Sequence, residues 1–108
     1  MKIKTIKIPI YQCKLTMILD KDLKYVEKKY KTVSLENFGA VVLKNHKEYR
    51  HYVVAFTDKH HISNIVHEIV HIKNNIFVDC AMEVDRFNDE PEAYLSGWLY
   101  DKIDKFLN

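Results

Sequence analysis

The hydrophobic period of the chain changes near Asp58, and this change constrains the fold more than any other feature of the sequence. Before it, apolar and polar residues alternate, as in Lys2 to Ile8, which predicts strands with one buried face. After it, apolar residues recur about every 3.6 positions, which predicts helices. Strands followed by helices indicate an α+β fold.

The strands are predicted from runs of alternating or β-branched residues. Pro9 ends the first strand or places it at a sheet edge. The segment Leu23 to Val33 fits either a strand or a short helix. The remaining predicted strands are Lys2–Ile8, Tyr11–Leu19, Ala40–Lys44 and Tyr49–Thr57.

Two helices are predicted after the strands. The first runs from about His60 to Lys73, and a connection follows through Phe77 to Phe87. The second starts at Asn88-Asp89-Glu90-Pro91, where polar capping residues, acids and a first-turn proline combine, and it ends near Phe106. The predicted apolar stripe of the first helix is Ile62, Ile65, Val66, Ile69, Val70 and Ile72; that of the second is Leu95, Leu99, Ile103 and Phe106.

Length and composition bound the class of protein. A chain of 108 residues, 47% hydrophobic and 30% charged, fits one soluble globular domain over residues 1–108. A net charge of +2 with only two arginines argues against a nucleic-acid partner, although the lysines leave that reading open as the weakest one. No apolar run suits a signal peptide or a membrane span, and Cys13 and Cys80 form no CxxC motif, so we expect free thiols and a cytoplasmic location.

The segment His67-Glu68-Ile69-Val70-His71 is an HExxH motif. Residues four apart share one side of a helix, so His67 and His71 can bind one metal ion, and zinc suits imidazole ligands. Glu68 can then act as general base on a water molecule activated by the metal. The alternative is a core helix whose histidines are hydrogen-bonded to carbonyls; it needs partners for three polar side chains.

A catalytic zinc site needs a third protein ligand, and the sequence offers several downstream. Glu92 shares the apolar stripe of the second helix and suits a metal on the core side. Glu90 shares a stripe of small residues with Ala93 and Gly97 that would let another helix approach, and we favour Glu90 for this reason. The other candidates by chemistry are Asp79, Cys80, Glu83, Asp85 and Asp89.

HEIVH followed about twenty residues later by NDEPEAYLSGWL resembles the glutamate-type, thermolysin-like zincins in a minimal form. The resemblance covers about His60 to Lys105 and is strongest to small zincin-like proteins of bacteriophages, in which an HExxH helix precedes an E-x-x-A-Y-L segment. It implies that Glu90 is the third zinc ligand. It also implies that a mostly antiparallel N-terminal sheet precedes the active-site helix and that a strand beside the cleft presents its backbone to an extended peptide. Tyr49–Thr57, or its neighbour in the sheet, is our candidate for that strand.

These observations predict a small zinc-dependent metallopeptidase with His67, His71 and Glu90 as ligands and Glu68 as base. It would act on a peptide or protein, without nucleic acid or membrane, in the host cytoplasm if phage-encoded. The competing hypothesis is a zincin-like protein that binds metal without turnover and serves phage–host interaction as a binding or regulatory module.

Overall fold

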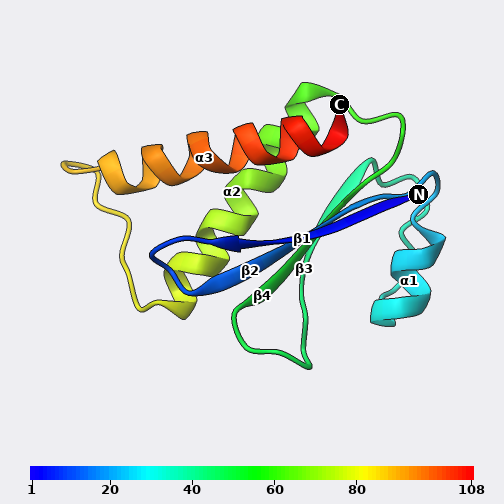
Figure 1. Ribbon diagram of the computed structural model, residues 1–108, viewed down its shortest axis with the longest axis horizontal. Coiled ribbons are helices and arrows are strands. Elements are labelled where there is room, and N and C mark those ends of the chain that lie inside the picture. Colours follow the sequence, from blue (N-terminus) through cyan, green and yellow to red (C-terminus); the bar gives the residue numbers. More distant parts are fainter.

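A four-stranded mixed sheet occupies the N-terminal half of the chain, and two long helices follow it (Figure 1). The structure is a computed structural model that describes residues 1–108. Its elements are β1 (Lys2–Ile8), β2 (Cys13–Leu19), α1 (Lys24–Tyr30), β3 (Ala40–Lys44), β4 (His51–Phe56), α2 (Ile62–Asp79) and α3 (Glu90–Leu107). The α+β fold predicted from the change of period is confirmed.

The strands lie in the order β1-β2-β4-β3, so β1 and β3 form the two edges. The pairs β1/β2 and β3/β4 are antiparallel, while β2 and β4 are parallel neighbours. The chain returns from β2 to its parallel neighbour through α1 and β3. The ambiguous segment after Leu23 is therefore helical over Lys24–Tyr30, and it covers the sheet face opposite α2 and α3 through Leu23 and Val26.

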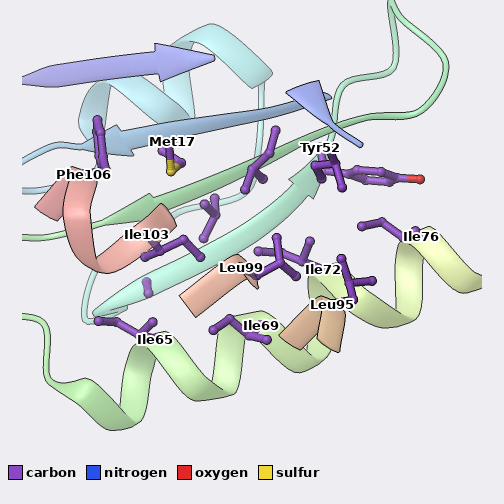
Figure 2. Close-up of a cluster of buried hydrophobic side chains, with 14 of the residues drawn as sticks. Met17, Tyr52, Ile65, Ile69, Ile72, Ile76, Leu95, Leu99, Ile103 and Phe106 are labelled. Atoms are coloured by element: carbon purple, nitrogen blue, oxygen red, sulfur yellow. The ribbon is translucent and has the colours of Figure 1, made fainter. Parts of the chain in front are cut away.

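The main core lies between the other sheet face and the two long helices. Figure 2 shows the isoleucines of α2 and the apolar residues of α3 directed toward β2 and β4. All four residues predicted as the apolar stripe of α3, Leu95, Leu99, Ile103 and Phe106, are buried. Burial of each such side chain contributes on the order of 1.5–3 kcal/mol, so this core holds α2 firmly against the sheet.

The apolar stripe of α2 differs from the prediction. Ile65, Ile69 and Ile72 are buried as expected, but Ile62, Val66 and Val70 are exposed. The helix also continues six residues beyond the predicted end at Lys73, to Asp79. The physical reason is that Ile76 and Phe77 extend the buried stripe beyond Lys73.

None of the helices is long and apolar enough to cross a membrane.

Candidate metal centre

The HExxH segment lies in the middle of α2, with its histidines on the side facing away from the core. At 3.6 residues per turn, His71 is about 40° around the helix from His67, whereas the isoleucine stripe lies about 140–200° from it. Both histidines are accordingly exposed, although the helix itself is anchored by buried residues. The motif therefore combines a rigid backbone with accessible imidazoles.

The two imidazoles converge on one another. The Nε2 atoms of His67 and His71 are 3.2 Å apart, and the rings meet edge to face with centroids 4.9 Å apart. Two nitrogens bound to one tetrahedral zinc at about 2.0–2.1 Å would be about 3.3 Å apart. In the metal-free protein this contact is a hydrogen bond between the two rings, and the same spacing fits two ligands of a single zinc ion.

Glu68 lies between the histidine side of α2 and the core. Its side chain is only 5% exposed. Burial raises the pKa of its carboxyl above the ordinary 4.5, and the nearby His67 and His71 partly oppose this shift. No hydrogen bond to a protein donor contributes to that pKa. Glu68 is thus a largely buried residue beside both imidazoles whose carboxyl lines the groove and has no hydrogen bond from the protein.

A groove of about 600 Å³ runs between this side of α2 and the segment Asn37 to Val42, which includes the start of β3. His67, Glu68 and His71 all line it. Because β3 is an edge strand, one side of its backbone has no neighbouring strand. The groove therefore places the motif beside backbone groups that are free to pair with another chain.

Asn64 and Gly39 lie at the end of this groove where α2 begins. Asn64 closes the start of α2, where its Oδ1 accepts a hydrogen bond from the backbone N–H of His61 at 2.7 Å. A Cβ added to Gly39 would lie 3.4 Å from Nδ2 of the same asparagine. The glycine thus lets the chain entering β3 pass close to α2.

The structure does not bring Glu90 to the histidine pair. Glu90 is exposed at the first position of α3, and nowhere in the protein are three His, Cys, Asp or Glu side chains grouped so that they could hold a metal ion. A Cβ at Gly97 would meet no atom within 4 Å, so the small-residue stripe that favoured Glu90 faces open space rather than α2. The packing argument for Glu90 is not met, and its assignment as ligand stays a prediction.

Glu92 is engaged elsewhere. Its carboxylate forms an ion pair with Lys73 of α2, and both side chains are largely buried. Lys73 lies about 200° around α2 from His71. The first turn of α3 is therefore attached to the side of α2 opposite the histidines, which explains why neither α3 glutamate stands beside them.

The remaining candidates are also distant from the motif or already bonded. Asp79 accepts hydrogen bonds from Tyr52 and Lys44 at the far end of α2. Cys80 is half-buried and lies 3.9 Å from the carbonyl oxygen of Tyr11. The other three, Glu83, Asp85 and Asp89, are exposed in the connection between the helices.

Sequence reasoning missed the two asparagines of the groove. Asn64 and Asn75 line it together with the motif. A helical wheel could have identified them, because they lie about 60° and 80° from His67, on the same side as His71. Both carry an amide that can donate to or accept from a bound chain.

Comparisons of the chain with protein-family models, with curated proteins and with solved structures found no match.

Proposed function

We propose that this protein is a zinc-dependent hydrolase of the metallopeptidase type. The observation that supports it best is the 3.2 Å separation of the His67 and His71 Nε2 atoms beside the buried carboxyl of Glu68. In this proposal His67 and His71 hold the metal. When bound, zinc would acidify a water molecule and polarise the carbonyl of the scissile bond.

Glu68 would act as the general base. It lies next to both imidazoles, and its raised pKa suits a group that accepts a proton from water and then returns it to a leaving amine. A carboxylate held by strong hydrogen bonds would be a weaker base, because such bonds stabilise the charged form. Glu68 has no such bonds from the protein.

The substrate would be an extended peptide lying along β3. The free edge of this strand borders the groove, and backbone pairing of this kind gives affinity that depends little on sequence. The predicted strand Tyr49–Thr57 corresponds to β4, and β3 is its neighbour in the sheet. The proposed peptide-binding strand is therefore the neighbour and not β4 itself. The resemblance to glutamate-type zincins agrees with this arrangement and is part of the proposal.

Replacement of Glu68 by Gln tests the enzymatic role. Purified wild-type protein should hold about one zinc per chain and cleave members of a random peptide library, detected by mass spectrometry. Glu68→Gln should keep the zinc and lose at least about a hundredfold in cleavage rate, because general base catalysis contributes that much. Glu83→Gln, an exposed glutamate outside the groove, is the matched control and should cleave normally.

The third ligand requires a separate comparison. We retain Glu90 as the proposed ligand, and Glu90→Ala should then weaken zinc binding by at least about tenfold. Glu92→Ala should leave zinc binding unchanged while lowering stability, because it frees Lys73 in a largely buried position. The reverse result would transfer the ligand role to Glu92.

The non-catalytic alternative predicts a different pattern. A zincin-like binding module would take up zinc through His67 and His71 and cleave nothing, and Glu68→Gln would then change no activity. The ion pair that holds Glu92 away from the histidines is the observation that favours this alternative.

A further inference from the structure

Five lysines from opposite ends of the chain gather around one groove. Lys2, Lys4 and Lys7 belong to β1, and Lys102 and Lys105 belong to α3. Side chains alternate along a strand, so Lys2 and Lys4 lie on the α3 side of β1 with Ile6 and Ile8, whereas Lys7 points to the other side. The groove has a volume of about 780 Å³. The ion pairs of the protein use Lys14, Lys24, Lys44 and Lys73, so none of these five lysines has a carboxylate partner. Lys2 donates a hydrogen bond to the carbonyl oxygen of Phe106, which keeps its ammonium at the groove.

The lining between these lysines is apolar and aromatic. It includes Ile6, Met17, Trp98 and Phe106. Trp98 is half-buried, and the ammonium of Lys102 lies 5.5 Å from its ring centre. Trp98, Lys102 and Lys105 follow the i, i+4, i+7 spacing of one helix side, so α3 presents a continuous aromatic and basic flank to the groove.

The other wall of the groove is a free sheet edge. Because β1 has only β2 as a neighbour, its outer backbone N–H and C=O groups have no partner strand. Pairing with β1 of a second copy would bring the three lysines of each strand onto one short ribbon, where their like charges repel. The charge of this edge therefore disfavours self-association and favours an acidic strand.

We propose that this groove binds an extended, acidic segment of a partner protein, which adds to the sheet beside β1. Its backbone would pair with β1, carboxylates on its α3 side would meet Lys2, Lys4 and the lysines of α3, and an apolar side chain on that same side would lie on Trp98. The free backbone edge and the absence of arginine from the lining favour a polypeptide over a nucleic acid. Since β1 and β3 are opposite edges of the sheet, this site is independent of the histidine groove and of the function proposed for it.

The single tryptophan of the chain makes the test direct. The probe is a capped heptapeptide, matched in length to the seven residues of β1, with glutamate at positions 1, 3 and 5, valine at position 7 on the same face, and threonine between them. Titration should change Trp98 fluorescence and saturate, and binding should weaken several-fold between about 50 and 200 mM salt. A peptide N-methylated at alternate residues, which keeps the charge but cannot pair along one edge, should bind at least about tenfold more weakly.

A matched pair of double variants tests the lysines. Lys102→Gln with Lys105→Gln should weaken peptide binding about tenfold. Lys28→Gln with Lys29→Gln removes the same charge from the last turn of α1 and should change binding less than about twofold. Circular dichroism checks that both variants are folded.

Several results would overturn the proposal. These are the absence of saturable binding, equal loss in both double variants, or equal binding of the N-methylated peptide. Tighter binding of a thymidine oligonucleotide than of the acidic peptide would assign the groove to nucleic acid instead. None of these outcomes depends on zinc, so this proposal and the hydrolase proposal can fail separately.

Discussion

Glu68 and Asp79 occupy equivalent places on α2 but have opposite surroundings. Eleven residues, about three turns, separate them, so both lie on the same side of the helix. Glu68 is beside the start of β3 and accepts no hydrogen bond from the protein. Asp79 is beside the end of β3 and accepts hydrogen bonds from Tyr52 at 2.5 Å and Lys44 at 3.0 Å.

The pKa values of the two carboxyl groups shift in opposite directions as a result. Burial raises the pKa of Glu68. Burial would also raise the pKa of Asp79, but the hydrogen bonds from Tyr52 and Lys44 outweigh it and lower the pKa. Asp79 is thus a structural carboxylate that joins α2 to β3 and β4. The burial of Glu68 lowers stability, and no hydrogen bond from the protein offsets this loss. Such an uncompensated cost is expected of a functional residue.

The largest expected effect is the stabilisation of the protein by zinc. It should depend on the histidines near the middle of α2 and not on Asp79 at its end. At a hundredfold excess over its Kd, zinc should stabilise the wild type by about 2.7 kcal/mol. His71→Ala should abolish this gain, while Asp79→Asn should keep it. Thermal unfolding with zinc and with a chelator measures the effect, and His46→Ala, an exposed histidine outside the motif, is the control. A zinc gain that survives His71→Ala would remove the proposed metal centre.

Loss of the Asp79 carboxylate should be the next largest effect. Asp79→Ala leaves the buried hydroxyl of Tyr52 and the ammonium of Lys44 without their acceptor and should cost about 2 kcal/mol. Relief of a negative charge at the C-terminal end of the helix offsets part of this cost. Urea unfolding gives the value, and Asp101→Ala, an exposed position on α3, should change stability by less than about 0.5 kcal/mol. A similarly small change in stability for Asp79→Ala would mean that the Asp79 carboxylate has no structural role, and that it does not differ from Glu68 in this respect.

Glu68→Gln should act in the opposite direction. In the metal-free protein at pH 7, a neutral amide of the same shape removes the cost of a buried charge and should raise stability by about 1 kcal/mol. The measurement is again urea unfolding in the presence of chelator, with the exposed Glu36→Gln as control. A clear loss of stability would mean that the carboxylate of Glu68 has a structural role like that of Asp79.

The sequence could predict those features of α2 and α3 that depend on patterns within one helix. Periodicity identified both long helices and the buried stripe of α3, because side chains such as Leu99 and Ile103 repeat at the helical period. The HExxH spacing identified His67, Glu68 and His71, because residues four apart on one helix are neighbours whatever the rest of the fold. The end of α2 was missed, since the polar residues at 73 to 75 interrupt the apolar pattern and the buried side chains of Ile76 and Phe77 continue the helix beyond them.

Features that depend on how distant elements meet could not be predicted. The parallel pairing of β2 with β4 depends on the path of the chain through α1 and β3. The ion pair of Glu92 with Lys73 depends on which side of α2 receives α3, and no pattern within either helix specifies that side. The same holds for the lysines of β1 and α3, which are dispersed along the sequence and meet only in the fold.

The smallest expected effect is a pH dependence of opposite sign at the two carboxyl groups. Glu68 has a folded pKa above its ordinary 4.5, so its burial costs nothing below pH 4.5, where it is neutral, and stability is lost as the pH rises through the folded value. Asp79 has a folded pKa below its ordinary 3.8, so its contribution is complete above pH 3.8 and is lost as the pH falls through the folded value.

Unfolding free energies of the metal-free protein, measured from about pH 3 to pH 8, would separate these contributions. Compared with the wild type, Glu68→Gln should flatten the decline above pH 4.5, and Asp79→Asn should flatten the decline below pH 3.8. Each slope is at most about 1.4 kcal/mol per pH unit. If both variants flattened the same limb of the curve, the two carboxyl groups would share one kind of environment, and Glu68 would lose its distinction as the residue that the fold leaves free for chemistry.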